Sequence, residues 1–362
     1  GTAILDYSTP AYRNRIINGA MMIDQRNAGL PVTVPATTNT FDTDRWLAYN
    51  SQASKFTMQQ SSTAPAGFQN SLLITSSAAT TVGASDYYQL QQRIEGFNVA
   101  DLNFGTSNAA TVTLSFWVNS SVTGTYGGTL ANSVTSRCYP FTYTISSANT
   151  WTKISVTIAG DTTSTGWVYT NGIGLIVNFS LGMGSSNQQA AGAWYGGYAG
   201  SATGTTNFVS TNGATFYITG VQLEKGSTAT SFDYRPYGTE LALCQRYYEK
   251  SYDVGTAPGT ITQSGARSAS NAAAFVNAAT TRNFSINATF AVTKRTTPNT
   301  VTIYDPAASN ASGKISGYSS ATQYTVSSIA TSGTTNLCQY ITTSSSPSQT
   351  EMSQFHFTVD AE

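Results

Sequence analysis

The sequence has little charge and no long apolar run, and each shortage excludes one class of function. Charged side chains make up 9% of the 362 residues, against about 25% in an average soluble domain. Seventeen basic and seventeen acidic residues give a formal net charge of zero. Without a basic surface to neutralise phosphates, we expect no nucleic-acid binding. No apolar run approaches the roughly 20 residues of a membrane-spanning helix, so we expect no membrane insertion.

Histidine and cysteine are also scarce. His356 is the single histidine, which excludes a metal site built from several imidazoles. Cys138, Cys244 and Cys338 lie far apart with no CxxC spacing. We therefore expect them to be buried as small apolar side chains rather than to bind zinc or to carry redox chemistry.

Catalysis finds little support in the sequence. There is no GxSxG nucleophile motif, and His356 alternates with phenylalanines in "QFHFTVDAE", as an ordinary sheet residue does. A glycosidase needs two carboxylates across the scissile bond, and sequence spacing does not show whether any two of the acidic residues converge in this way. We expect the protein not to be an enzyme.

Aromatic and β-branched residues are plentiful, and they alternate with polar ones. Aromatics are 12% and hydrophobic residues 40% of the chain, a composition that favours strands over disorder. In "ATVTLSFWVNS" every second residue from Ala110 to Val118 is apolar, and "TKISVTIAG" and "GIGLIVNFSLG" repeat the pattern. The last of these predicts that Ile173, Leu175 and Val177 share one face. One apolar and one polar face is typical of antiparallel sheets packed in pairs.

Helical periodicity is nearly absent. The best candidate is "TELALCQRYYEK", in which Leu241, Cys244 and Tyr248 fall at spacings of three and four and Thr239 stands where a cap would. It predicts a short helix or an extended linker.

These patterns predict an all-β protein made of two antiparallel β-sandwich domains in tandem, joined by a short connecting segment. Residues 1–15 form an N-terminal arm or linker, 16–237 a large sandwich, and 238–362 a smaller C-terminal sandwich. The stretch from Thr215 to Ser251 concentrates charge at this boundary. Its charges are interpreted as closing the first domain and anchoring the second, rather than as an active site.

Aromatic rings among neutral hydrogen-bonding residues suit carbohydrates, because one face of a pyranose is apolar and stacks on a ring. The glycine-rich "AGAWYGGYAG" predicts a loop that carries several rings. The candidate carbohydrate-binding residues are Trp194, Tyr195, Tyr198 and Trp117, with Tyr87 and Tyr88 of "SDYYQLQQRIEG" as further rings. The alternative for each ring is packing in the core or at a sheet edge.

No cofactor is required by any motif, although a structural calcium ion is an open possibility. Small sandwiches often hold calcium where their termini meet, with carboxylate and carbonyl ligands. Asp24, Glu224 and Asp233 flank the two ends of the first domain and are the candidate ligands, but no EF-hand loop is present.

Several segments together resemble the tail-fibre-like receptor-binding proteins of bacteriophages and prophages. They follow the family's order and span residues 16–251. The segments are "IINGAMMIDQRNAG" from Ile16, "FDTDRW" from Phe41, "LQQRIEGFNVADLNFGT" from Leu90, "LSFWVNSSVTGTY" from Leu114, "TWTKISVTIAGDTT" from Thr150 and "ITGVQLEKGSTATSFDYRPYGTELALCQRYYEKS" from Ile218. The terminal "FTVDAE" is also similar to a common tail ending. Asp24 departs from the family pattern, where a larger apolar or aromatic residue often precedes the "QR".

The resemblance implies a jelly-roll sandwich akin to carbohydrate-binding modules, and a virion tail protein made in the host cytoplasm. It implies recognition of bacterial surface polysaccharide, assembly as a symmetric oligomer, usually a trimer, and contact with other tail proteins. It also implies a structural role for Arg45, Trp46, Glu95 and Glu224. The alternatives are a purely structural tail or baseplate component and, less favoured, a glycan depolymerase; no parallel β-helix repeat supports the latter. No signal-peptide pattern opens the chain, and Gly at position 1 suggests a processed or trimmed chain.

Overall fold

The protein divides into two units, each described here by itself. The computed structural model describes residues 12–269, 282–298, 300–307, 312–317, 323–325, 333–343 and 353–362. The first unit is Gly1–Met22 with Gly29–Tyr237, and the second is Ile23–Ala28 with Gly238–Glu362. The first unit thus ends at Tyr237. In addition, the short segment Ile23–Ala28 belongs to the second unit, which no sequence pattern suggests.

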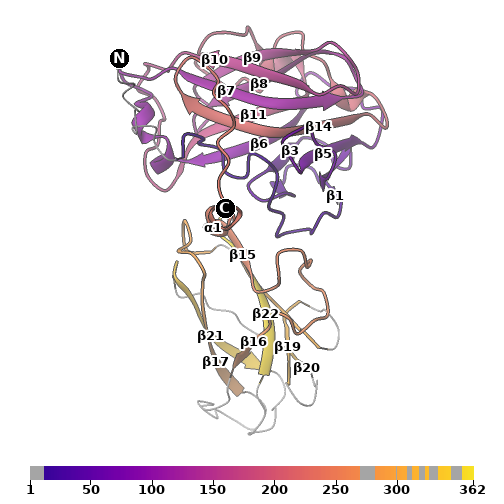
Figure 1. Cartoon of the computed structure of the whole chain (residues 1–362), viewed down its shortest axis with the longest axis vertical. Coiled ribbons are helices and arrows are strands. Elements are labelled where there is room, and N and C mark those ends of the chain that lie inside the picture. The colour runs from indigo at the N-terminus through magenta and orange to yellow at the C-terminus, as the bar shows by residue number, and fades with distance from the viewer. Residues whose placement is uncertain are drawn as a thin grey trace, which may run out of the picture. The chain divides into compact units, whose positions relative to one another are not determined.

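The first unit is a sandwich of two six-stranded antiparallel sheets (Figure 1). Sheet A runs, in spatial order, β1 (Val32–Thr33), β4 (Phe56–Ser61), β5 (Ser71–Ser76), β14 (Thr215–Lys225), β7 (Val112–Ser120) and β10 (Thr152–Ile158). Sheet B runs β2 (Thr40–Phe41), β3 (Leu47–Asn50), β6 (Tyr87–Glu95), β11 (Ile173–Met183), β8 (Gly124–Ala131) and β9 (Cys138–Ile145). A small parallel pair, β12 (Gln188–Gln189) with β13 (Ser201–Ala202), and four short 3-10 turns, at 96–98, 100–102, 185–187 and 208–210, complete it.

The chain crosses repeatedly between the two sheets, as in a jelly roll, and its alternating apolar side chains meet between them. From β7, Leu114, Phe116 and Val118 are fully buried, as the sequence predicts. Phe116 packs edge-to-face on Phe179 of β11 with ring centroids 5.0 Å apart. The long core strands therefore account for the all-β fold, which is confirmed.

A β-bulge corrects one detail of the predicted alternation. Leu175 and Val177 of β11 are buried in the core, but Ile173 is not. The pairing of β11 with β6 shifts register between Ile173 and Leu175, and one extra residue turns the preceding side chains to the other face. Ile173 and Ile176 consequently lie on the outer face of sheet B.

The second unit is built around its last strand, β22 (Ser353–Asp360), drawn in yellow in Figure 1. Four strands pair directly with β22, and β20 pairs with β19. They are β15 (Tyr248–Lys250), β16 (Arg267–Ala269), β18 (Thr300–Tyr304), β19 (Lys314–Gly317) and β20 (Gln323–Thr325). The separate pair β17 (Arg282–Thr289) and β21 (Asn336–Thr343) is antiparallel. The described part of this unit is thus also built of strands.

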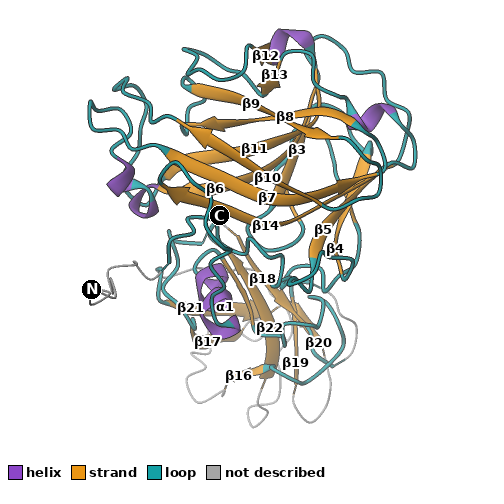
Figure 2. Ribbon diagram, turned by 45° about the horizontal axis from the view of Figure 1, so that its top comes forward, coloured by secondary structure: helices purple, strands orange, loops and turns teal. Residues whose placement is uncertain are grey.

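The predicted helix exists but is shorter than expected. Helix α1 spans Tyr237–Gln245, so Thr239 lies inside it and does not cap it. Tyr248 begins strand β15 and is not part of a helical face. The expectation for these two residues was wrong because strand β15, which pairs with β22, begins three residues after the helix ends. Within the described residues, strands predominate and α1 stands out as the single α-helix (Figure 2).

Charged residues after Thr215 form structural hydrogen bonds within the first unit. Glu224 accepts hydrogen bonds from the backbone N–H and hydroxyl of Thr230, at 2.8 and 2.7 Å. Arg235 donates to the carbonyls of Asn14 and Ile16, and Asn14 donates through its backbone N–H to Asp233 at 3.2 Å. These bonds tie the end of the first unit to its beginning. Residues 1–11 of the predicted arm lie outside the described residues.

Other expectations concern individual side chains. Trp46 is fully buried and donates from its indole Nε1 to the carbonyl of Asn18 at 3.1 Å, consistent with a structural role. Cys138 and Cys244 are buried free thiols, as predicted; the side chain of Cys338 lies outside the described residues.

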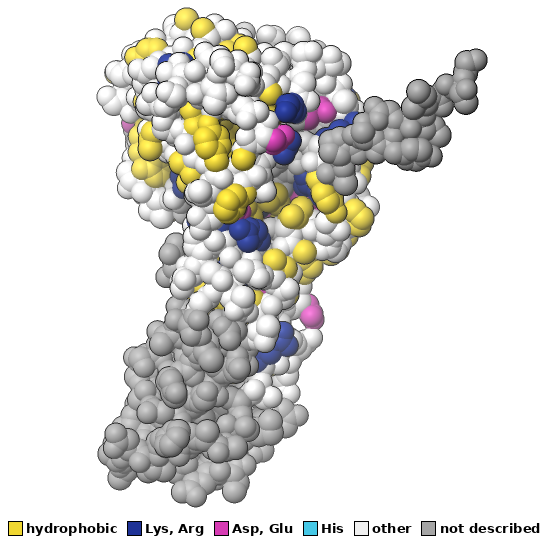
Figure 3. Space-filling view, turned by 90° about the vertical axis from the view of Figure 1, so that its left-hand side faces the viewer, with side chains coloured by type: hydrophobic (Ala, Val, Ile, Leu, Met, Phe, Trp, Pro, Cys, Tyr) yellow, Lys and Arg dark blue, Asp and Glu magenta, His cyan; other side chains and the backbone are white. Residues whose placement is uncertain are grey.

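No helix in the described ranges is long and apolar enough to cross a membrane. On the face in Figure 3, charged side chains are sparse among the described residues.

Candidate functional site

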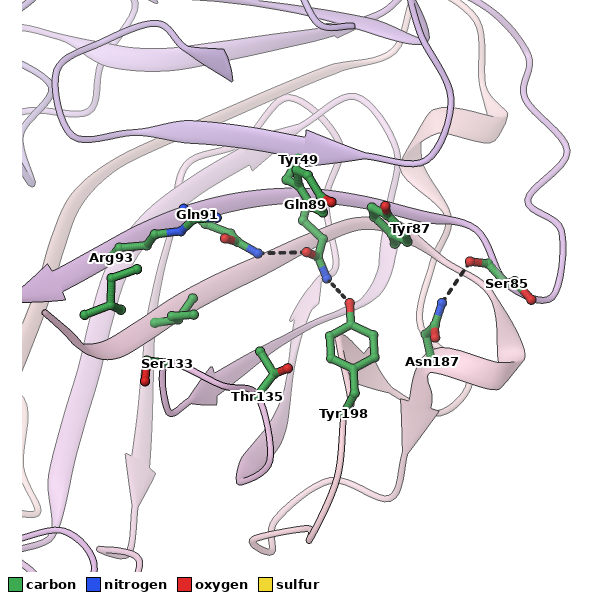
Figure 4. Close-up of a pocket in the computed structure, with 12 residues that line it drawn as sticks. Tyr49, Ser85, Tyr87, Gln89, Gln91, Arg93, Ser133, Thr135, Asn187 and Tyr198 are labelled. Carbon is green, nitrogen blue, oxygen red and sulfur yellow. Dashed lines mark hydrogen bonds between the residues drawn. The ribbon is translucent and has the colours of Figure 1, made fainter. Parts of the chain in front are cut away.

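A pocket of about 430 Å³ opens on the outer face of sheet B (Figure 4). This volume is within the range of sites for small ligands. Three tyrosines, several amides and hydroxyls, two isoleucines and one arginine line it. The lining residues are Tyr49, Ser85, Tyr87, Gln89, Gln91, Arg93, Ser133, Thr135, Ile173, Ile176, Asn187 and Tyr198.

Strand β6 supplies the floor of the pocket because of the two-residue period of a strand. Tyr88 and Leu90 are fully buried in the sandwich core. Tyr87, Gln89, Gln91 and Arg93 therefore point to the opposite, outer face. The row is polar along its length, as expected for the face of a sheet that does not pack on another sheet.

Two glutamines and a tyrosine form a directed chain of hydrogen bonds across this floor (Figure 4). The amide of Gln91 donates to Gln89 Oε1 at 2.8 Å, and the amide of Gln89 donates to the hydroxyl of Tyr198 at 2.6 Å. Gln91 Oε1 is buried and has no partner in the described structure. The chain therefore presents an unused acceptor at one end and a tyrosine hydroxyl, with its own proton to donate, at the other.

Tyr49 and Tyr87 form a stacked pair at one wall. Their ring centroids are 5.3 Å apart with an interplanar angle of 18°. Burial, and then a hydrogen bond with the Tyr49 side chain, raise the pKa of Tyr87 to about 12. Burial likewise raises the pKa of Tyr198 to about 12. Both phenols are thus neutral at physiological pH and act as hydrogen-bonding groups rather than as bases.

The rim next to Tyr87 is held by the carboxylate of Asp86. Ser51 donates to its Oδ1, and Gln52 and the backbone N–H of Gly83 donate to its Oδ2, all at 2.8 Å. Asn187 fastens the same segment by donating to the carbonyl of Ser85 at 3.0 Å. Asp86 is therefore occupied in shaping the rim, and it does not line the pocket.

The glycine-rich loop 191–200 brings Tyr198 to this floor. Tyr195 forms an antiparallel bridge with Cys138 at the start of β9. Thr129 donates to the carbonyl of Ala199 at 2.8 Å, and Asn178 donates to that of Gly200 at 2.7 Å. The loop is thus tied to three strands of sheet B, to β9 before Tyr198 and to β8 and β11 after it.

The structure does not bring the four predicted carbohydrate-binding residues together. Tyr198 lines the pocket, whereas Tyr195 lies next to it in the chain, 40% exposed and outside the lining. Trp117 lies on β7 of sheet A, half-buried, and so belongs to the other sheet. Of the two further rings, Tyr87 lines the pocket and Tyr88 is in the core.

Trp194 packs into an aromatic cluster rather than into the pocket. Its ring lies 5.5 to 5.8 Å from those of Tyr139, Trp167 and Phe104, and each contact is edge-to-face. Its indole Nε1 donates to the carbonyl of Ala159 at 2.7 Å. The side chain is thus satisfied by packing and by a hydrogen bond.

The remaining lining residues were not singled out from the sequence. Gln89, Gln91 and Arg93 stand in "YYQLQQRIEG", where polar residues occupy consecutive positions and blur the alternation. The sequence did contain a signal for a polar row on one face of this strand, because a polar residue stands at every second position after Tyr87. Ser133 and Thr135 come from the β8–β9 turn, and nothing in the sequence relates this turn to β6.

The candidate calcium ligands do not gather. Glu224 is bonded to Thr230, and Asp233 accepts from Asn14, whereas Asp24 accepts from the backbone N–H of Asn27 at 2.9 Å within the second unit. No group of three or more His, Cys, Asp or Glu side chains in the described ranges could hold a metal ion.

His356 is a buried structural residue of the second unit. Its Nδ1 accepts from the hydroxyl of Ser251 at 2.9 Å, and its Nε2 lies 2.8 Å from the carbonyl of Thr262, which defines the Nε2–H tautomer. Tyr252 stacks on the ring at 3.6 Å. The Ser251 hydroxyl, although hydrogen-bonded to His356, is buried and also accepts from the backbone N–H of Phe357. These two hydrogen bonds join Ser251 to strand β22, which is a structural role.

Acid should destabilise the second unit through His356. Burial lowers the pKa of this imidazole below its ordinary value, and the nearby Arg267 adds to the effect, while the Thr262 carbonyl and Asp253 oppose it. The unfolded chain therefore takes up a proton before the folded one does. Stability is complete above about pH 6.5, the ordinary histidine pKa, and falls as the pH drops below it. Chemical denaturation at pH 8 and pH 5.5 measures the loss; His356→Gln should flatten this dependence, and an unchanged slope would contradict the assignment.

Comparison with known proteins yields only distant structural similarity. No family model and no curated protein matches the chain. The enzymatically active domain of tailspike protein 4 of bacteriophage CBA120 is 13% identical over 60% of this chain, with a TM-score of 0.33; the chain covers 22% of that protein. A family 11 carbohydrate-binding module of Clostridium thermocellum, in complex with a mixed-linked tetrasaccharide, is 10% identical over 55% of this chain and 98% of its own, with a TM-score of 0.27. A xylan-binding domain of Paenibacillus barcinonensis is 17% identical over 50% and 92%, with a TM-score of 0.28.

Proposed function

We propose that this protein binds bacterial surface polysaccharide without cleaving it, and that the pocket on sheet B holds the saccharide. The observation that carries the proposal is the composition of the lining. Tyrosine rings, amides and hydroxyls lie together in a volume of about 430 Å³, around the chain from Gln91 to Tyr198. Rings suit the apolar face of a pyranose, and neutral donors and acceptors suit its hydroxyls.

The absence of carboxylates from the lining supports a binding role over a catalytic one. None of the twelve residues around the pocket is Asp or Glu, whereas most glycosidases need two carboxyl groups across the scissile bond. Asp86, the acidic residue next to Ser85 and Tyr87, accepts three hydrogen bonds from the rim. A role as general acid would require breaking them.

The place of this activity in a phage tail is inferred from the sequence resemblance. A single shallow polar site should be weak, in the millimolar range of about 4 kcal/mol, because small polar ligands gain little from burial. A symmetric oligomer, as a trimer, would present several copies and raise avidity by about 10²–10⁴-fold without new contacts. Reversible attachment of a virion to a host surface fits this combination.

Tyr198→Ala should weaken polysaccharide binding about 10-fold, because it removes both a ring and the hydroxyl that ends the hydrogen-bond chain. An array of bacterial surface polysaccharides, probed with the full chain, identifies ligands, and calorimetry measures the change. Tyr195→Ala is the matched control, since this ring lies outside the lining and should leave affinity unchanged. The reverse result, with Tyr195 needed and Tyr198 not, would move the site out of the pocket. Release of reducing ends from a bound polysaccharide would show an enzyme.

A purely structural tail component is the second candidate, and one observation favours it. Phe68, Phe232 and Tyr234 form a three-ring cluster with centroids 4.8 to 5.5 Å apart, and Tyr234 is 57% exposed. An exposed aromatic cluster suits packing against another subunit. Tight oligomer formation without binding to any polysaccharide would favour this candidate.

A further inference from the structure

Arg93 is the single charged residue among those that line the pocket. It stands on β6 two residues after Gln91, on the same outer face. Within the described residues its guanidinium makes one hydrogen bond, from Nη2 to Asn39 Oδ1 at 2.9 Å. No carboxylate of the described ranges lies within ion-pair distance, and its Nε is buried without a partner.

Arg137 and Arg15 of the first unit, unlike Arg93, are paired with carboxylates. Arg137 holds Asp161 with two hydrogen bonds of 2.8 and 2.7 Å, and Arg15 meets Asp101 at 2.8 Å. Burial lowers the pKa of Arg93, yet an arginine remains charged at neutral pH. Leaving a cation part-buried without an anion is unfavourable. The pocket therefore carries a net positive charge that no residue of its lining neutralises.

We propose that the saccharide taken by this pocket is acidic, a hexuronate-containing glycan whose carboxylate pairs with Arg93. This rests on the proposed function, of which it names the ligand class. The planar guanidinium fork matches a carboxylate with two parallel hydrogen bonds, and the second N–H of Nη2 remains to form such a pair together with Nη1 or Nε. Asn39 holds Nη2 and so limits the rotation of the guanidinium before the ligand arrives.

The neutral part of the floor completes the recognition of a sugar acid. Gln91 is 92% buried, and its Oε1 has no partner, so it can accept from a ring hydroxyl. Tyr198, at the other end of the chain, donates its hydroxyl proton. An anionic group, a donor and an acceptor on one ring distinguish a uronate from a neutral hexose, which would leave Arg93 unpaired.

The test compares each uronate-containing polysaccharide on an array with its carboxyl-reduced form, which has the same linkages but neutral sugars. The full-length protein should bind the acidic form at least about 10-fold more tightly, because a charge-assisted pair is stronger than a neutral one. Arg93→Gln should abolish this difference, and Arg93→Lys should retain part of it, since lysine keeps the charge but not the fork. Added salt should weaken binding by the original protein and not by Arg93→Gln. Melting curves check that both variants fold.

The outcomes separate this inference from the proposed function. Equal binding to acidic and reduced forms, with Tyr198→Ala still weakening both, would overturn the inference and leave a neutral-glycan site. Preference for sulfated or phosphorylated glycans over uronates would overturn the assignment to a carboxylate. Binding that neither Arg93→Gln nor Tyr198→Ala affects would place the site elsewhere and overturn both. Failure to bind any polysaccharide would overturn the proposed function, and the inference with it.

Discussion

Exchanging Lys294 for methionine is expected to lower the free energy of unfolding of the second unit by about 3–5 kcal/mol, the range for breaking a buried ion pair. The side chain of Lys294 is fully buried, and its Nζ lies 2.5 Å from Glu249 Oε2. It also donates to the carbonyls of Gln245 and Val292 at 2.7 and 2.9 Å. Removing the cation leaves a buried carboxylate that, among the described residues, keeps only the backbone N–H of Ala291 as a donor.

Hydrogen exchange on the full chain is the appropriate measurement, because it reports each unit separately. Protection should fall in peptides that cover β15 and β22 and stay unchanged in those that cover β6 and β11. Lys153→Met is the matched control, since Lys153 is exposed on β10 and the same exchange there should change stability by no more than about 0.5 kcal/mol.

A double variant shows whether the stability comes from the ion pair between Lys294 and Glu249 or from the backbone hydrogen bonds of these two side chains. Burial lowers the pKa of Lys294, and the neighbouring Glu249 opposes this shift. Each charge therefore costs free energy to bury and regains it only with its partner. Glu249→Gln together with Lys294→Met should recover much of the stability that Lys294→Met alone loses. Full loss in the double variant would mean that the backbone hydrogen bonds of the two side chains carry the stability instead.

Much of the fold could be predicted from the sequence, because a sandwich core imposes a two-residue period that single residues report. Leu114, Phe116 and Val118 are where that period places them. Ile173 is not, because the bulge beside it depends on how β11 pairs with β6, eighty residues away in the chain. Tertiary pairing also replaced the predicted helical end at Tyr248 with a strand.

The candidate site could be predicted only in part, for a related reason. Tyr198 was identified because its glycine-rich loop is conspicuous in composition. The roles of Gln91 and Arg93 depend on tertiary contacts. Gln91 lies at one end of a hydrogen-bond chain that reaches Tyr198, more than a hundred residues away. Arg93 lacks an acidic neighbour in the described structure. Neither property has a local signature, since ion pairs and amide chains join residues that folding brings together.

Buried charge in the first unit follows the same logic around Asp161. Burial alone would raise the pKa of Asp161, but hydrogen bonds from Arg137 and the backbone of Thr163 lower it. The indole of Trp167 donates to the same carboxylate at 3.2 Å. Because Trp167 also contacts Trp194, this ion pair supports the aromatic cluster on which the loop 191–200 rests.

Trp194→Ala should therefore lower stability more than it lowers polysaccharide affinity. The sequence alone made Trp194 a candidate carbohydrate-binding ring, with packing in the core or at a sheet edge as the alternative. The structure gives Trp194 three aromatic neighbours and a hydrogen bond to Ala159. We therefore expect the free energy of unfolding to fall by about 2–4 kcal/mol. This is at or below the range for a fully buried tryptophan, because the ring is only half-buried. Thermal unfolding and polysaccharide titration on the same sample measure both quantities.

Tyr198→Ala provides the contrast that makes this result informative. Tyr198 is 39% exposed and its ring makes no aromatic contact in the described structure, so its loss should cost little stability and much affinity. Trp194→Ala should show the opposite order at temperatures where the variant remains folded, because the loop keeps its ties through Thr129 and Asn178. Unchanged stability with lost binding in Trp194→Ala would instead make this ring part of a glycan surface, and would separate that surface from the pocket. The two variants thus distinguish a tryptophan that supports the loop from a tyrosine that the loop presents.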